Sequence, residues 1–312
     1  MRFAHRFAGA AAFAVALATA SATAFAGDGR AALDRVPKDY GMVMSINVDR
    51  AKGSQLYKDA FAMAAKNPET KKTLDLLKAK ASFDFSRDVK TLVFGINGAA
   101  QQAGGDPKMV VLVEGKFDMT KIGAFAKGQG KAITEASYQG VKYWTVDDGE
   151  MALMAPYLAI TPKGSMSAVI DVFKAKGQSV KKNAAFMKMF ATTDTTKDMW
   201  GVFLVPQQVG GMIKAQFGHG VDAAGMSVDI KTGVKSKVQV ATASDAAAKA
   251  LADMAKMMIA QAASAPELQA MGLGAAVKRV NISASKNLCN VAFDLTEAEL
   301  KSLKGMLGAF MP

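Results

Sequence analysis

The sequence predicts an α+β protein of two pseudo-repeated halves, each a mostly antiparallel sheet with helices packed on one face. Three observations lead to this class. Apolar runs of strand length alternate with segments of helical periodicity. Several strand patterns are joined by short turns, and such hairpins pair their strands antiparallel. The order of elements also starts again after residues 192–198, TTDTTKD, a polar segment without apolar periodicity that we interpret as a linker.

The first 26 residues are expected to be a secretory signal peptide. Arg2 and Arg6 form a basic start, an uncharged alanine-rich stretch follows, and Ala24-Phe25-Ala26 fits the A-x-A cleavage pattern. A membrane anchor is the alternative, because the stretch approaches spanning length, but its many Ala, Ser and Thr residues favour cleavage. We therefore expect a soluble exported protein, periplasmic or secreted, with no transmembrane segment in the mature chain.

The first half, expected at residues 27–195, begins with a buried strand at 41–48. A helical region follows to about residue 81, interrupted at Asn67-Pro68 because the residue before a proline resists helical dihedrals. The remaining elements are expected in this order: strands at 92–96 and 109–113, a helix near 119–127, a hairpin through 138–144, a strand pair at 151–161, a helix with the apolar stripe Met166, Val169, Ile170 and Phe173, and a short helix at 184–191.

The second half, expected at residues 196–312, repeats this order with one helix and one hairpin fewer. Its elements are a strand at 200–205, a helix after Pro206, period-two strands at 226–230 and 234–240, a helix after the N-cap Ser244, the strand pair RVNISAS and NLCNVAFDL, and a final helix that begins with the capping box Thr296 and Glu299. A rival register would align FDMT (117–120) with FDLT (293–296). The first register is preferred because it accounts for the whole chain.

One run of the chain resembles a group of exported bacterial proteins of unknown function. The segments YQGVKYW, MALMAPYLAITPKGSMSAVIDVF, SVKKNAAFMKMF and WGVFLVP are similar to their succession of a Tyr-x-Gly-Val hairpin, a strand pair, a helix and an Asn-x-x-Phe helix. The resemblance implies a duplicated α+β exported protein. It implies no catalytic residues.

The composition excludes several classes of catalytic site. Beyond residue 26 one histidine, His219, and one cysteine, Cys289, remain, so a zinc site of several histidines cannot form. Phosphate-loop, dinucleotide-binding, HExxH, CxxC and GxSxG motifs are absent. Cys289 shares a strand face with Val291 and Phe293, which predicts a buried thiol of raised pKa. His219 lies in FGHGV without a Ser or Cys motif to act on, so we interpret it as a loop residue.

The segment MAKMMIAQ places Met254, Met257 and Met258 within five residues. They could be soft metal ligands, but such a site needs several convergent donors, and His219 is the one histidine available. With Ser244 as N-cap, Met254 and Met258 fall on a stripe expected to face the core, flanked by Met257. We therefore interpret all three as packing residues. The expected stripe is Ala247, Leu251, Met254 and Met258.

The segment VDDGEM (146–151) contains Asp147 and Asp148 beside a glycine. Oxygen ligands for a cation, or paired carboxylates for glycoside hydrolysis, are two interpretations. Asp-Gly between two apolar strands indicates a hairpin turn first, and we prefer that interpretation.

The chain is basic, with a formal charge of +12 that falls to +10 without Arg2 and Arg6. Lysines concentrate at 66–81 and 174–183, where they form either a solvated helix face or a surface for anionic lipid or envelope polymer. Nucleic acid is not an expected partner for an exported chain. We expect an envelope protein with a non-catalytic binding or structural role and an unknown partner. The alternatives are a basic docking module and a carboxylate-based hydrolase. No catalytic residue, cofactor or metal is predicted.

Overall fold

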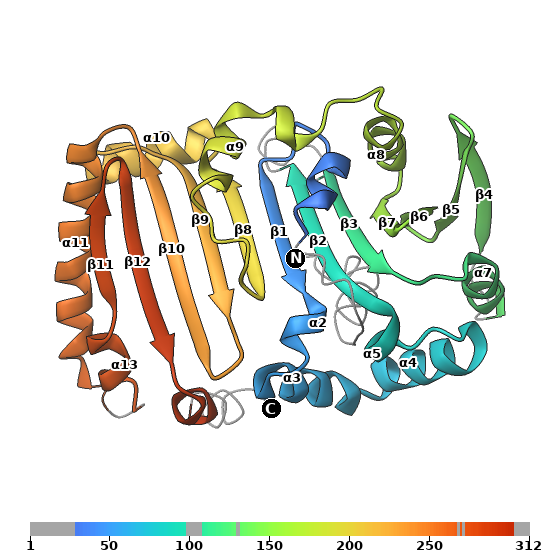
Figure 1. Cartoon of the computed structure of the whole chain (residues 1–312), viewed down its shortest axis with the longest axis horizontal. Coiled ribbons are helices and arrows are strands. Elements are labelled where there is room, and N and C mark those ends of the chain that lie inside the picture. The colour runs from blue at the N-terminus through green and yellow to red at the C-terminus, as the bar shows by residue number, and fades with distance from the viewer. Residues whose placement is uncertain (1–28, 98–107, 129–131, 267–268, 270–271, 303–312) are drawn as a thin grey trace. The chain divides into compact units, whose positions relative to one another are not determined.

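The computed structural model describes residues 29–97, 108–128, 132–266, 269 and 272–302 (Figure 1). The expected signal peptide, residues 1–26, lies outside them. Contacts divide the chain into two compact units, Met1–Ala184 and Ala185–Pro312. Each is described by itself below. The fold class is confirmed as α+β, with antiparallel sheets.

The sheet of the first unit joins its strands through antiparallel pairs. Their spatial order is β1 (Met42–Asn47), β2 (Val89–Asn97), β3 (Lys108–Gly115), β7 (Tyr157–Pro162), β6 (Gly149–Met154), β5 (Val141–Val146) and β4 (Ile133–Tyr138). The expected hairpin in YQGV is β4–β5. Its turn residues Gln139 and Gly140 both have positive φ, as a two-residue turn matched to strand twist requires.

The described helices of this unit lie before, between and after these strands. They are η1 (Ala31–Arg35), α2 (Val48–Ala51), α3 (Gln55–Lys66), α4 (Pro68–Ala81), α5 (Phe85–Asp88), α7 (Met119–Gly128), α8 (Met166–Phe173), η2 (Val180–Lys182) and α9 (Ala184–Phe190), which crosses the boundary between the units. The interruption expected at Asn67-Pro68 is confirmed. The Asn67 side chain accepts hydrogen bonds from the backbone nitrogens of Glu69 and Thr70, and Pro68 opens α4.

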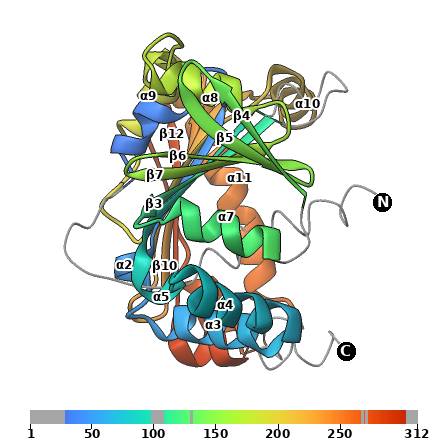
Figure 2. The ribbon, with the colours of Figure 1, turned by 90° about the vertical axis from the view of Figure 1, so that its right-hand side faces the viewer.

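Helices cover the sheet of the first unit on both faces. On one face, alternate residues of β2, β3, β6 and β7 form a hydrophobic cluster with Leu77 of α4 and Ile122 of α7, and Met151 belongs to it. The neighbouring Glu150 points to the opposite face, because side chains alternate along a strand, and there it contacts the start of α8. Figure 2 accordingly shows α8 and α7 on different sides of β6 and β7. The expected helical layer is present, and the first unit adds a second layer.

The second unit repeats the strand order of the first. Its sheet runs β8 (Met199–Leu204), β9 (Val221–Asp229), β10 (Val234–Thr242), β12 (Leu288–Leu295) and β11 (Asn281–Ser285). Its helices include α10 (Gln207–Phe217), α11 (Asp245–Ala263) and α13 (Gly274–Lys278), and the described residues 297–302 are also helical. The helix α11 packs on β10, β11 and β12. This order matches β1-β2-β3-β7-β6 element by element, with β4–β5 as the extra hairpin of the first copy.

The polar segment 192–198 is partly packed, because buried residues alternate with exposed ones along it. Thr193, Thr195 and Asp198 are buried, and the Asp198 carboxylate accepts a 2.9 Å hydrogen bond from the backbone nitrogen of Ile230. Just before this segment, the ring of Phe190 in α9 meets Trp200 of β8 edge to face. These contacts tie α9 and the segment to the second unit. The boundary from contacts therefore falls after Ala184, earlier than the expected position after residue 195.

The buried face of α11 includes Ala247 of the expected stripe but differs from the rest of it. Ala248 and Ala252 are fully buried, whereas Met257 and Met258 are 67% and 62% exposed, and Met254 is half-buried. The interpretation of Met257 and Met258 as packing residues is therefore wrong. Alanine allows α11 to lie close to the sheet, so the small side chains occupy the interface and the longer methionines of this turn remain in solvent.

Candidate functional site

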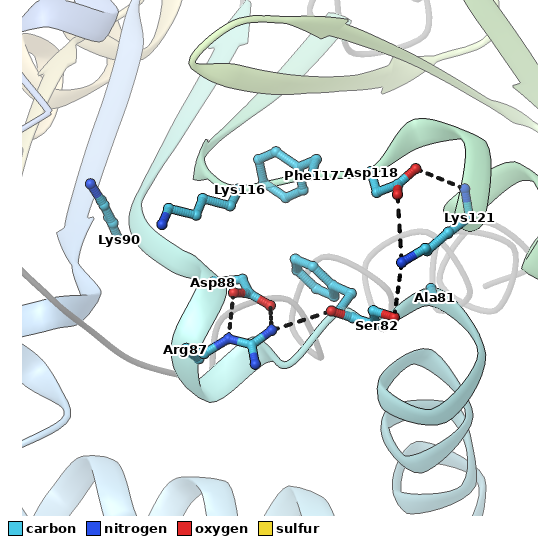
Figure 3. Close-up of a pocket in the computed structure, with 10 residues that line it drawn as sticks. Ala81, Ser82, Arg87, Asp88, Lys90, Lys116, Phe117, Asp118 and Lys121 are labelled. Atoms are coloured by element: carbon cyan, nitrogen blue, oxygen red, sulfur yellow. Dashed lines mark hydrogen bonds and ion pairs between the residues drawn. The ribbon is translucent and has the colours of Figure 1, made fainter.

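The first unit contains a pocket of about 540 Å³ between the α4–α5 connection, the start of β2 and the β3–α7 connection (Figure 3). We call it the Arg87–Lys121 pocket. Basic and acidic side chains line it with two phenylalanines, and the basic ones are in excess. The charged and aromatic lining is Phe83, Arg87, Asp88, Lys90, Lys116, Phe117, Asp118 and Lys121.

The pairing of β2 with β3 brings the pocket's two halves together. Val89 lies opposite Gly115, but the next pair is Thr91 with Glu114, so Lys90 is an extra residue at a β-bulge. A bulge turns a side chain away from the regular alternation and is common beside functional sites. The backbone nitrogen of Lys116 donates a 3.0 Å hydrogen bond to the carbonyl of Asp88, which fixes the start of the β3–α7 connection.

Asp88 holds Arg87 in a defined position. Its carboxylate is buried and accepts 2.8 Å hydrogen bonds from Nε and Nη2 of Arg87 and from the backbone nitrogen of Asp84. Nη2 of Arg87 also donates to the carbonyl of Ser82 at 3.3 Å. Hydrogen bonds and charge from Asp88 raise the pKa of the Arg87 guanidinium. Within the described part of the chain Nη1 of Arg87 has no partner, so its N–H groups remain available to a ligand.

Lys121 and the aromatic pair Phe83 and Phe117 form another part of the lining. The Lys121 ammonium donates to Ser82 Oγ at 3.2 Å and lies 3.8 Å from the Asp118 carboxylate. Phe83 and Phe117 stack with ring centroids 5.5 Å apart. By contrast, the Lys116 ammonium makes no polar contact with any described residue. Figure 3 shows Lys90 and Lys116 together on one side of the pocket and the Asp118–Lys121–Ser82 contacts on the other.

This arrangement suits an anion. A guanidinium with free N–H groups and several ammonium groups bind phosphate or carboxylate oxygens through charge-assisted hydrogen bonds. Both carboxylates of the pocket are engaged with neighbouring basic groups and backbone nitrogens. Over the described ranges, no three His, Cys, Asp or Glu side chains are grouped as metal ligands would be.

The two acidic residues considered in the sequence lie in a turn outside this pocket. Asp147 and Asp148 are exposed and connect β5 to β6, where Val146 pairs with Gly149, so the hairpin-turn interpretation is confirmed. The third carboxylate of that segment, Glu150, is buried and accepts hydrogen bonds from the backbone nitrogens at the start of α8. Its contacts make it a helix-capping group.

The single histidine and cysteine beyond residue 26 lie on different elements. His219 is exposed between α10 and β9. Cys289 is 1% exposed in β12. Burial raises the pKa of its thiol, and the positive charge of Lys256, which acts to lower that pKa, has the smaller effect. The predicted buried, unactivated thiol is confirmed.

The two lysine-rich segments lie on the surface of the first unit. On α4, Leu77 and Ala81 are buried, and Leu74 packs against the same cluster. Every lysine of 66–81 and of 174–183 is exposed. In the described ranges, none of the helices is both long and apolar enough for a membrane span.

Sequence reasoning missed the basic residues of the pocket, although one signal was present. Strands expected at 92–96 and 109–113 pair antiparallel across one loop, so residues before the first strand lie beside residues after the second. Leu92 lies opposite Val113. Residues that precede Leu92 therefore lie beside residues that follow Val113, which brings Arg87 and Lys90 near Lys116. In the lysine-rich segments 66–81 and 174–183 the charges are close together in sequence, whereas the charges of the pocket are not.

Comparison with known proteins adds information on the fold. No protein-family model and no curated protein matches the chain. Among solved structures, crystal form III of TP0453 is similar, with a TM-score of 0.51 and 10% identity over 86% of this chain and 96% of that chain. Crystal form I has a TM-score of 0.49 and 10% identity over 92% and 98% of the two chains. At this identity, the likeness to crystal form III shows that the chain shares the α+β fold of TP0453.

Proposed function

We propose that this chain is an exported, non-catalytic binding protein of the bacterial envelope that holds an anionic group in the Arg87–Lys121 pocket. One observation carries the proposal. Arg87, Lys90, Lys116 and Lys121 come from separate segments and line the same pocket. The net positive charge of the chain and the expected signal peptide at residues 1–26 support the same function.

Electrostatics favour an occupied pocket. Like charges that share a small volume repel one another, and an anion between them converts that repulsion into attraction. Phosphate oxygens could accept hydrogen bonds from Nη1 of Arg87 and from the Lys116 ammonium, the two donors without a described partner. Lipid headgroups, anionic envelope polymers and free phosphate share this chemistry. The stacked Phe83 and Phe117 offer an apolar wall to the part of the ligand that carries the anion.

The carboxylates support a binding role over acid–base chemistry. Asp88 accepts hydrogen bonds from Arg87 and from the backbone of Asp84, and Asp118 accepts one from the backbone nitrogen of Lys121 at 3.1 Å. A general acid or base needs a free position from which to exchange a proton with the substrate. In this pocket both acidic groups instead orient basic ones.

The test is binding of inorganic phosphate, measured by calorimetry, in parallel with sedimentation of the protein with phosphatidylglycerol vesicles. Lys116→Glu reverses the charge that has no described partner, and Lys72→Glu makes the same change on the exposed face of α4. We expect Lys116→Glu to weaken binding roughly tenfold or more, which corresponds to about 1.4 kcal/mol, and Lys72→Glu to bind like the unmodified chain. Added salt should weaken binding in each case.

The calorimetry and the vesicle sedimentation together distinguish the possible sources of the anion. Phosphate binding without sedimentation indicates a soluble anion, and sedimentation that depends on Lys116 indicates a headgroup or polymer. Equal losses in the two variants would show that overall charge, and not the pocket, attracts the anion. Absence of binding in both arms would also contradict the proposal.

A further inference from the structure

A second pocket, of about 640 Å³, lies at the hairpin β4–β5 and the adjoining β6. It shares no lining residue with the Arg87–Lys121 pocket. We call it the Trp144 pocket. Its size falls within the range of roughly 300–1,000 Å³ that is typical of small-molecule sites. Its apolar lining includes Met119, Trp144, Met151, Leu153, Met154 and Phe173.

The Trp144 side chain forms one wall of this pocket. On the sheet it lies between Glu135 of β4 and Met151 of β6 in register. From the other side, α7 approaches the indole through Gly123, where a β-carbon would come within 2.8 Å of the ring. A side chain at position 123 would have to displace the ring, so the close approach of α7 to Trp144 uses the absence of a β-carbon at Gly123.

The other end of the pocket is set by Phe173, the last residue of α8. The Arg35 guanidinium lies 4.1 Å from the centroid of the Phe173 ring, and Arg35 Nη1 donates a 3.1 Å hydrogen bond to the Phe173 carbonyl. A cation over an aromatic face and a hydrogen bond to the same residue fix both its ring and its backbone. The two aromatic residues lie on the α7 face and the α8 face, and the pocket reaches both because β5 and β6 pair only from Trp144–Met151 to Val146–Gly149.

Between these two aromatic residues the lining is flexible and apolar. Met119, Met151 and Met154 contribute unbranched thioether side chains, which adapt to irregular or mobile apolar ligands. Leu153 is 38% exposed, although its neighbours on β6 are buried. An exposed leucine beside a methionine-lined hollow is suited to a ligand whose apolar part enters from solvent.

The two lysines that line the pocket differ in their polar contacts. Lys142 is paired, since its ammonium lies 2.7 Å from the Glu135 carboxylate. Lys174, next to Phe173, makes no polar side-chain contact with any described residue. One unpaired positive charge therefore accompanies an apolar hollow. This combination matches a molecule with an apolar chain and a single anionic end.

We propose that the Trp144 pocket binds a single-chain anionic amphiphile of the long-chain fatty-acid class, with the acyl chain against Trp144 and the carboxylate at Lys174. The inference concerns a different pocket from the proposed anion site and does not depend on it. Membrane insertion is not needed, because the ligand is a monomeric amphiphile that enters the protein.

Tryptophan quenching by dibrominated stearate, used below its micelle concentration, tests this directly. The chain has two tryptophans, and Trp200 is 2% exposed in the second unit. In Trp200→Phe the remaining emission comes from Trp144, and we expect saturable quenching that unlabelled oleate reverses. In Trp144→Phe the remaining emission comes from the buried Trp200, and we expect little quenching. Circular dichroism establishes that both variants are folded.

Two further variants, each combined with Trp200→Phe, identify the protein contacts of the acyl chain and of the carboxylate. Leu153→Asp places a charge at the apolar entrance and should reduce affinity at least tenfold. Lys174→Gln should weaken binding of the fatty acid several-fold and leave its methyl ester unaffected, whereas Lys176→Gln, an exposed control, should change neither. Unsaturable quenching, equal quenching of the two tryptophan variants, or an unchanged affinity in Leu153→Asp would overturn the proposal. An unchanged affinity in Lys174→Gln would overturn the position assigned to the carboxylate.

Discussion

The backbone of Gly115 lies directly against the carbonyl oxygen of Asp88, so close that a β-carbon at position 115 would overlap that oxygen. The same carbonyl accepts the hydrogen bond from the nitrogen of Lys116. Gly115, the last residue of β3, and Lys116, the first residue of the β3–α7 connection, therefore both contact one carbonyl group. The geometry of the Arg87–Lys121 pocket depends on the absence of a side chain at position 115.

Gly115→Ala should damage both stability and the pocket. The added methyl must push the end of β3 away from α5, and inserting a methylene-sized group into a packed site costs about 1–3 kcal/mol. We expect a loss of this size in the urea unfolding free energy and weaker phosphate binding. Gly128→Ala is the control, because a β-carbon there meets nothing within 4 Å. Equal unfolding free energies in the two variants would contradict this account of the contact.

Glu150 should contribute to stability as the cap of α8. Its Oε2 atom accepts hydrogen bonds from the backbone nitrogens of Met166 at 2.9 Å and Ser165 at 3.2 Å. Glu150→Ala leaves a buried N–H group without an acceptor, which costs about 1–3 kcal/mol. Glu150→Gln retains one acceptor oxygen and should recover part of this loss. Asp148→Ala changes a residue in the exposed turn, and its unfolding free energy should stay within about 0.5 kcal/mol of that of the unmodified chain. A loss as large as that of Glu150→Ala would contradict the prediction.

Glu299 should make stability depend on pH in the acidic range. The capping box predicted for Thr296 and Glu299 is confirmed, because Glu299 Oε2 accepts from the backbone nitrogen of Thr296 at 2.8 Å and the backbone nitrogen of Glu299 donates to Thr296 Oγ1 at 3.2 Å. The hydrogen bond from Arg279, followed by that from the Thr296 backbone, lowers the pKa of Glu299 from 4.5 to about 2.

Because the pKa is lower in the folded chain than in the unfolded one, ionised Glu299 stabilises the fold above pH 4.5, and this contribution is lost as the pH falls towards 2. Glu299→Gln should therefore be less stable than the unmodified chain at pH 7, and the difference should disappear near pH 2. Urea unfolding across this range measures it. A difference that stays constant with pH would show that the carboxylate charge makes no contribution.

The exposed methionines of α11 should be dispensable for folding. Replacing Met257 and Met258 by serine should change the unfolding free energy by no more than about 0.5 kcal/mol, as is usual for surface positions. Ala252→Leu, by contrast, forces a larger side chain between α11 and the sheet and should cost about 1–3 kcal/mol. Thermal and urea unfolding distinguish the two cases. A large loss in the double serine variant would restore the packing interpretation.

Local patterns predicted the parts of the fold that local physics controls. The hairpin at Gln139 and Gly140 follows from turn chemistry, and the start of the last helix follows from Thr296 and Glu299. The restart of the element order after residue 198 anticipated the repeated strand order of the second unit. The buried face of α11 was not predictable in this way. Alanine and methionine are both apolar, so the sequence of the helix fits more than one buried face. Which face is buried depends on how closely the helix approaches its sheet.

The sequence by itself determined the α+β class, the duplicated order of elements and the scarcity of histidine and cysteine, because periodicity, turn residues and composition are properties of neighbouring residues. Only the tertiary structure decided which charged side chains meet in the Arg87–Lys121 pocket. Arg87 and Lys116 are far apart along the chain, and they line one pocket because β2 pairs with β3 in one register, with Lys90 at a bulge and Gly115 against Asp88. Register and bulge result from packing across the whole sheet, and no single segment encodes them.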